Sequence, residues 1–204
     1  MKKLLFALPL LAAVPLLAQM PKEPPGKPDA SLVTGGSYTL EGSHTQVLFS
    51  YAHLGLTNNM GLLSGGTGTL KLDPKAPNAA SISVEVPIST IHTTIAKLDE
   101  EFQSPKFFDV AKFPTAKFVS TSVKVTGTSA EITGNLTIKG ITKPVTLKAS
   151  FAAAGTVNFG VKKEAVSFDA TGIIKRSDFG LGAAVPIVGD DVTLKIVAAF
   201  EKSA

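Results

Sequence analysis

The sequence predicts an all-β protein whose antiparallel strands form a barrel or a sandwich. Three observations support this prediction. Segments in which apolar and polar residues alternate recur along most of the chain, short turn signals separate them, and only one window has helical spacing. Gly65, Gly66 and Gly68 fall within one expected strand, where glycine often marks a bulge or a corner. They favour closure into a barrel, which at about eight strands can hold one small ligand.

The first residues have the pattern of an export signal. Lys2 and Lys3 precede the apolar run LLFALPLLAAVPLLA, and Ala18 is a small residue at which a signal peptidase could cut. The run contains two prolines and is shorter than the about 20 residues that span a membrane. We therefore predict a signal peptide over residues 1–18 and a periplasmic or secreted location in a bacterium. An uncleaved membrane anchor is the alternative.

A segment rich in proline and glycine follows, over residues 19–36. It shows no periodicity, so we predict a flexible or extended spacer. Residues 37–204 then have the length of a single domain that can bury a core of its own. Because the chain contains no cysteine, no disulfide can stabilise this domain.

Charge and aromatic composition argue against a nucleic-acid partner. The formal net charge is +4, and removal of Lys2 and Lys3 with the signal lowers it by two, to +2. Such a mild excess does not provide the basic surface that nucleic acids need. The chain has no Trp and two Tyr, so the stacking platforms of single-strand binders are also poorly represented.

The expected strands follow from alternation along the chain. Ile82 and Val84 share one face of a strand, for example, while Ser83 and Glu85 take the other. The same pattern, with turn signals between the segments, predicts strands at residues 37–42, 46–55, 64–73, 82–88, 114–126, 132–138, 145–151, 163–176 and 192–200.

One window has helical spacing. In residues 94–103, the apolar side chains of Ile95, Leu98 and Phe102 recur at the spacing of one helix face, and charged residues fill the other positions. We predict a short helix there. The acidic run that begins at Asp99 is expected to be a solvated face of this helix.

The helix leads into an aromatic connection, Ser104–Pro114, that carries Phe107, Phe108 and Phe113. Burial of each ring would contribute roughly 1.5–3 kcal/mol, so we do not expect these rings to stay in water. Two interpretations remain open. The rings complete the core of the barrel, or they cover one end or side of it and line a cavity.

Four segments carry a resemblance to a known family: HTQVLFSYAHLG (44–55), SPKFFDVAKFPTAKFVST (104–121), GNLTIKGITKPVTLKASF (134–151) and RSDFGLG (176–182). Together, and in this order, they resemble the YceI-like family of polyisoprenoid-binding, lipocalin-like periplasmic proteins. The resemblance implies a lipocalin-like, eight-stranded antiparallel β-barrel. It also implies a long apolar pocket for an isoprenoid or another long-chain amphiphile.

Aromatic side chains on the predicted strands, the helix and the connection are the candidate lining of this pocket. We expect the following residues to line it: Phe49, Tyr51, Phe102, Phe107, Phe108, Phe118 and Phe168. An apolar stripe that ends in one polar group suits an amphiphile with a long tail and an oxygen-rich head.

Two residues end such stripes and are the head-group candidates. His53 follows the apolar residues of its strand, and Arg176, the only arginine of the chain, ends another stripe. The alternative for Arg176 is an ion pair with Asp178, Asp99 or Asp109 that ties the last hairpin to the helix.

We therefore predict an exported, non-enzymatic carrier or scavenger of a polyisoprenoid, a quinone-like lipid or a fatty amide. No cofactor, metal or catalytic residue is expected, because the spacing of the histidines fits no zinc site and no nucleophile elbow or phosphate loop occurs. Two alternatives remain: an enzyme that acts on a bound isoprenoid or quinone-like lipid through His53, and a structural or interaction module with a filled barrel. Transient membrane contact and a homodimer are left open.

Overall fold

The structure is a computed structural model that describes residues 23–158 and 162–203. The predicted signal peptide, residues 1–18, lies outside the described residues.

Antiparallel strands make up most of the described chain. Their bounds are β1 (Gly36–His53), β2 (Thr57–Ser64), β3 (Thr67–Leu72), β4 (Ser81–Pro87), β5 (Thr115–Thr126), β6 (Ser129–Ile138), β7 (Ile141–Val157), β8 (Lys163–Lys175) and β9 (Val188–Lys202). The order across the sheet is β2-β1-β3-β4-β5-β6-β7-β8-β9, and β1 also pairs with β9.

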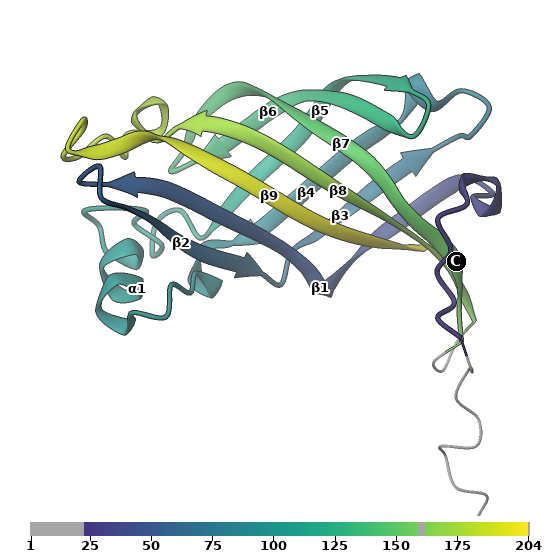
Figure 1. The fold of residues 1–204 in the computed structure, drawn as a ribbon, viewed down its shortest axis with the longest axis horizontal. Helices are drawn as coiled ribbons and strands as arrows, with labels where there is room; N and C mark the ends of the chain where they lie inside the picture. Colours follow the sequence, from purple (N-terminus) through teal and green to yellow (C-terminus); the bar gives the residue numbers. More distant parts are fainter. Residues whose placement is uncertain (1–22, 159–161, 204) are drawn as a thin grey trace, which may run out of the picture.

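The pairing of β1 with β9 closes the sheet into a barrel (Figure 1). β3 pairs with the first residues of β1, and β2 pairs with residues 46–53 of the same strand. β2 and β3 therefore share one position beside β1, and the closed barrel has eight strands. This confirms the predicted fold class.

The region where β2 and β3 separate differs from the sequence prediction. Residues 37–42 and 46–55 were expected as two strands, but residues 37–42 and 46–53 lie in the single strand β1, which contains a bulge between Glu41 and Gln46. No strand was expected over β2, because Asn58 and Asn59 are turn residues, yet pairing with β1 extends them. Gly65, at a φ of 69°, separates β2 from β3 opposite the bulge.

The predicted helix is present as α1 (Ala96–Gln103). Phe102 is buried and Leu98 is half-buried, as expected from the helical spacing. Ile95 precedes the helix as its N-cap and is 55% exposed, so the apolar face is shorter than predicted.

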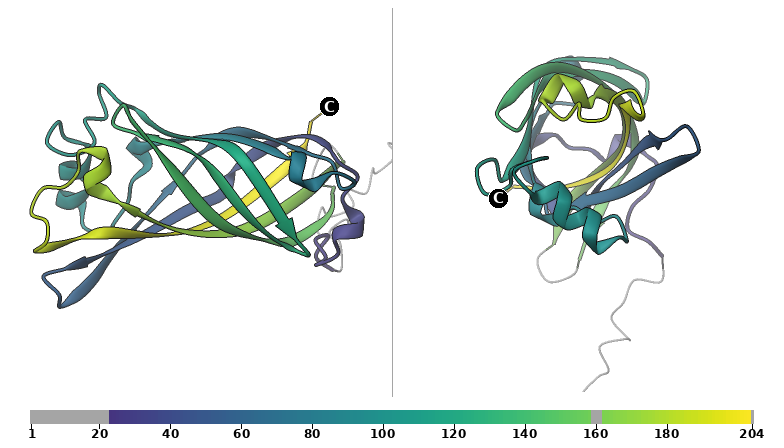
Figure 2. Two further views of the ribbon diagram at one scale, coloured as in Figure 1. Left: turned by 90° about the horizontal axis from the view of Figure 1, so that it is seen from above. Right: turned by 90° about the vertical axis from the view of Figure 1, so that its left-hand side faces the viewer.

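The barrel has two distinct ends (Figures 1 and 2). At one, which we call the α1 end, α1, the aromatic connection and the 3-10 helices η4 (Ile88–Thr90) and η5 (Arg176–Phe179) lie between strands. At the other, the η2 end, lie η2 (Ala30–Leu32), η3 (Pro77–Ala79) and the last residues of β9.

The chain before β1 packs on the barrel. Lys27 and Ala154 form an antiparallel bridge with N···O distances of 2.9 Å, and Val33 packs against a buried cluster that includes Tyr38 and Val166. The described part of the predicted spacer is thus held at the η2 end from Lys27 onward.

Candidate functional site

The barrel encloses a cavity of about 470 Å³. Aliphatic and aromatic side chains from strands all around the barrel line it, among them Val84, Phe118, Ile132, Leu147, Phe168 and Ile196. Pockets for small molecules typically measure about 300–1,000 Å³ and are mostly apolar. The barrel is therefore hollow, which contradicts the alternative of a filled barrel.

Small side chains widen the cavity beside β6, β7 and β8. Ala130, Ala149 and Ala170 stand side by side on β6, β7 and β8 and all three line the cavity. The next position in this row is Ile196 on β9. Three neighbouring side chains that end at Cβ leave space that larger residues would fill in a barrel of this size.

An aromatic cluster lies at the α1 end. Phe102 packs edge-to-face against four rings, with centroids 6.2 Å from Phe49, 6.4 Å from Tyr51, 5.5 Å from Phe107 and 6.1 Å from Phe108. Each such pair contributes roughly 0.5–1.5 kcal/mol beyond burial.

The connection joins this cluster to the cavity wall. Phe107 and Phe108 also pack against the buried cluster of Ile138, Val145 and Ile174, and these three residues line the cavity. The aromatic connection thus covers the cavity at the α1 end, and both open interpretations are partly correct: the rings form core, and this core closes a hollow.

The structure separates the predicted lining residues into two groups. Phe118 and Phe168 line the cavity, whereas the five rings of the aromatic cluster lie behind its lining. The reason is the path of β1. Beyond the bulge β1 pairs with β2 instead of β3, so the face that carries Phe49 and Tyr51 looks toward α1.

The cavity reaches the surface at the η2 end. Its lining there includes Ala30, Pro74, Gly127, Thr128 and Ser129, and all of these residues are exposed. They come from η2, the β3–β4 loop and the turn between β5 and β6. We call this rim the mouth. Its residues follow no periodic pattern, so it could not be predicted from the sequence.

Polar contacts hold the N-terminal segment next to the mouth. Glu164 accepts hydrogen bonds from the Thr34 amide (2.9 Å), the Thr34 hydroxyl (2.5 Å) and the Tyr38 hydroxyl (2.7 Å), and Lys202 Nζ lies 3.6 Å away. Burial alone would raise the pKa of Glu164, but these hydrogen bonds and the Lys202 charge lower it below its ordinary value. Burial and the Glu164 carboxylate raise the pKa of Tyr38 to about 12.

Arg176 holds a loop and is not brought to the cavity. Its Nε donates to the Gly189 carbonyl (2.8 Å), its Nη2 to Val188 (2.7 Å), and its Nη1 to Ala183 (2.9 Å) and Leu181. The guanidinium therefore satisfies backbone carbonyls of the loop that leads into β9. Neither the head-group role nor the ion pair with Asp178, Asp99 or Asp109 matches this arrangement.

His53 is also away from the cavity. It ends β1, opposite Thr57 and Val188, at the α1 end, and it is not among the lining residues. The structure therefore places neither head-group candidate in the cavity wall.

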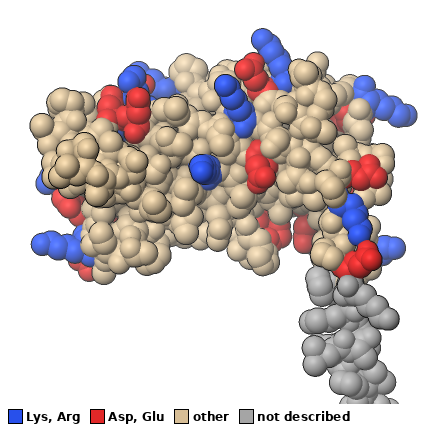
Figure 3. Space-filling model, in the orientation of Figure 1, with Lys and Arg blue, Asp and Glu red and all other residues tan. Residues whose placement is uncertain are grey.

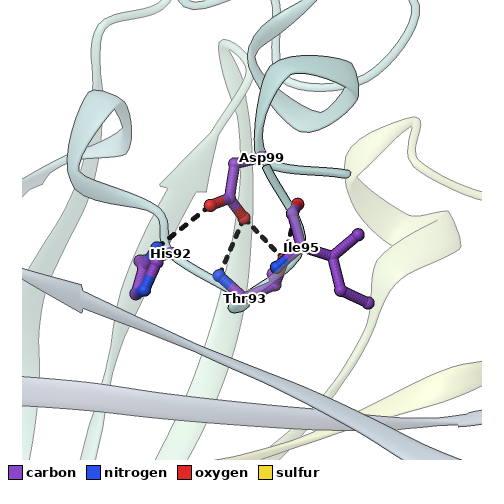
Figure 4. A network of polar contacts seen from close by, with 4 residues as sticks. All are labelled: His92, Thr93, Ile95 and Asp99. Carbon is purple, nitrogen blue, oxygen red and sulfur yellow. Dashed lines mark hydrogen bonds and ion pairs between the residues drawn. The ribbon is translucent and has the colours of Figure 1, made fainter. Parts of the chain in front are cut away.

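The acidic run of α1 has a structural role that its sequence pattern did not indicate. Asp99 accepts hydrogen bonds from the Thr93 amide (2.7 Å) and hydroxyl (2.6 Å), and its other oxygen lies 3.0 Å from His92 Nδ1 (Figure 4). The Thr93 hydrogen bonds lower the pKa of Asp99. His92 pairs with Leu62 of β2, so these contacts fasten α1 to the barrel.

Titratable side chains are nearly absent from the cavity wall. Among the lining residues in the described chain, Lys117 alone is titratable, and its Nζ pairs with Glu85 at 2.9 Å. No group of three His, Cys, Asp or Glu side chains suited to a metal ion occurs in residues 23–158 and 162–203. None of the helices in the same ranges is long and apolar enough to cross a membrane.

A further lining residue, Thr45, was not expected from the sequence. The bulge in β1 shifts the inward positions from even numbers, such as Tyr38 and Leu40, to odd numbers, such as Val47 and Phe49. Thr45 therefore faces inward and is 5% exposed.

Comparison with known sequences gives one family. A family model described as YceI-like domain matches residues 38–200. The protein YceI of Salmonella arizonae is 39% identical over 156 residues, which cover 76% of this chain and 81% of the relative.

Solved structures share the barrel. Burkholderia cenocepacia BcnA superposes with a TM-score of 0.66 at 23% identity, over 77% of this chain and 96% of that chain. The Campylobacter jejuni YCEI protein superposes with a TM-score of 0.64 at 26% identity, over 75% of this chain and 90% of that chain. A polyisoprenoid binding domain from Saccharophagus degradans, implicated in plant cell wall breakdown, superposes with a TM-score of 0.58 at 12% identity. The match covers 81% of this chain and 98% of that chain. At these low identities, BcnA and the S. degradans domain show similarity of fold alone.

Proposed function

The chain belongs to the YceI-like family, and on this basis we propose that it carries or sequesters a long apolar molecule, such as a polyisoprenoid, inside the barrel. The observation that carries the proposal is the cavity of about 470 Å³, whose wall is almost wholly aliphatic and aromatic. Burial of a lipid tail in such a wall is favourable by about 25 cal/mol per Å² of apolar surface. A quinone-like lipid or a fatty amide would fit the same apolar cavity.

The difference between the two ends of the barrel indicates how the bound lipid is oriented. The aromatic cluster closes the α1 end, and the mouth opens at the η2 end. The tail would enter through the mouth and run toward Ile138, Val145 and Ile174. Loading and release would occur at the mouth, during transient contact with a membrane.

We propose binding without catalysis. An enzyme that acts on the lipid would need a titratable group in the cavity, and general acids or bases must come within hydrogen-bond reach of the reacting atoms. His53 was the candidate for this role and lies outside the lining, which favours a carrier. The sequence of residues 1–18 supports export, and hence a periplasmic or secreted carrier.

Extraction of the purified protein tests the proposal. We expect an organic extract of protein produced with its leader in a bacterial host to contain about one long-chain lipid per chain by mass spectrometry. A fluorescent polyprenol should bind to delipidated protein. Extracts without lipid, together with no binding of the polyprenol, would refute the carrier function.

A further inference from the structure

Thr45 is a buried polar residue in an apolar wall. It is 5% exposed, and its neighbours in the cavity lining are Val47 on its own strand and Ala198 and Phe200 on β9. The other hydroxyl side chains of the lining, Thr128, Ser129 and Ser150, are exposed. Thr45 thus supplies the one buried hydroxyl among the lining residues that the structure describes.

The backbone around Thr45 explains one half of its hydrogen bonding. At the bulge, β1 and β9 pair at Glu41 with Ala199 and again at Gln46 with Val197, so the ladder is irregular between these pairs. The Ala199 amide donates to Thr45 Oγ1 at 3.2 Å and is satisfied in this way. A hydroxyl can also donate one hydrogen bond. Within the described ranges, this is the one hydrogen bond of the Thr45 hydroxyl, so its proton is available to another acceptor.

Thr45 lies nearer to the η2 end of the barrel than the aromatic cluster does. Ala199 lies three residues before Lys202, the last residue of β9 at the η2 end. At about 3.3 Å per residue, this is about 10 Å along the strand. The aromatic cluster, which includes Phe49 and Tyr51, lies farther along β1 toward the α1 end. A lipid whose polar group lay beside Thr45 would direct its tail toward the closed end.

The residues around Thr45 also favour a lipid group that carries no charge. Lys117, the lone titratable lining residue in the described chain, pairs with Glu85, so an anion at Thr45 would be desolvated without a counter-charge. An uncharged acceptor oxygen would gain a hydrogen bond in a low-dielectric wall at little desolvation cost.

We propose that Thr45 selects lipids that carry an uncharged hydrogen-bond acceptor, such as a carbonyl oxygen, at the depth of Thr45 in the cavity. The proposal rests on the proposed function, because it assigns the ligand class of the same cavity. The hydroxyl donates to the lipid oxygen while Oγ1 continues to accept from the Ala199 amide.

The test uses two probes that differ in one group: a long-chain methyl ketone and the alkane with CH2 in place of its carbonyl. Each competes with the fluorescent polyprenol for wild-type protein, Thr45→Val and Thr45→Ser. We expect Thr45→Val to weaken ketone binding about 3- to 10-fold relative to the alkane, and Thr45→Ser to retain the preference for the ketone. The ratio of the two probes cancels any loss of stability from the unpaired Ala199 amide.

Infrared spectroscopy of the bound ketone, with a 13C-labelled carbonyl, gives a second measurement on the wild-type protein. A carbonyl stretch shifted to lower frequency than in alkane solvent supports the hydrogen bond, provided that Ser150→Ala preserves the shift. An unshifted stretch, or equal effects of Thr45→Val on both probes, overturns the proposal. If neither probe nor polyprenol binds wild-type protein, the carrier function itself fails, so the two failures are distinguishable.

Discussion

Filling the cavity from within should abolish lipid binding without loss of the fold. Ala170 lines the cavity between Ala149 and Ile196, so Ala170→Phe would project a ring into the hollow. The six carbons of the ring would occupy the space of about six lipid methylenes. At about 0.8 kcal/mol per buried CH2, the lipid would lose about 5 kcal/mol of binding free energy. Rearrangement of the lipid recovers part of this, so we expect binding at least about 100-fold weaker.

Displacement of the fluorescent polyprenol measures the affinity, and thermal unfolding measures the stability. Thr171→Phe is the matched control, because Thr171 is exposed on the outer face of the same strand. We expect the control to have wild-type affinity and a free energy of unfolding within about 0.5 kcal/mol of wild type. Ala170→Phe should still unfold in one cooperative transition, because the cavity has room for the ring. Wild-type affinity of Ala170→Phe would show that the lipid binds elsewhere.

Three further predictions concern the ends of the barrel. The pKa of Glu164 is lower in the folded protein than its ordinary value of 4.5. The carboxylate therefore stabilises the fold above pH 4.5, and this contribution is lost as the pH falls through the folded-state pKa. The melting temperature of Glu164→Gln should lack this drop in acid, and identical pH profiles of variant and wild type would contradict the assignment. Phe102→Ala should lower the free energy of unfolding, measured in urea, by about 3–5 kcal/mol because Phe102 is buried. The control Ile95→Ala should lower it by about 0.5 kcal/mol or less because Ile95 is exposed. Similar losses for the two variants would argue against the aromatic cluster. Arg176→Lys should speed amide hydrogen exchange in residues 181–189, since one ammonium cannot reach the same carbonyls; unchanged exchange would show that the guanidinium does not hold this loop.

Alternation along the chain was sufficient to predict most strands, because strands with one apolar face recur at period two. It could not predict β2, where Asn58 and Asn59 have turn propensity and only pairing with β1 makes the segment extended. Residue parity identified the inward face of β1 correctly at Phe49 and Tyr51. It could not show that this face meets α1 there instead of the cavity.

The polar parts of the molecule were the least predictable. Arg176 ends an apolar stripe, yet backbone carbonyls of a loop, which carry no signature in the sequence, take up its guanidinium. Thr45 enters the cavity wall only because of a bulge, and a bulge shifts parity without changing residue type. The loop that follows Arg176 determines the position of its guanidinium, and contact with β9 determines that of Thr45.

Closure through β1 and β9 also determines when the protein can fold. Tyr38 pairs with Lys202, so the first and last strands of the sheet must meet before the circle is complete. Pairings so far apart in sequence form slowly, and until the final strand arrives both open edges could pair with other chains. A nascent chain would therefore have open sheet edges, and be vulnerable to aggregation, until β9 has been synthesised.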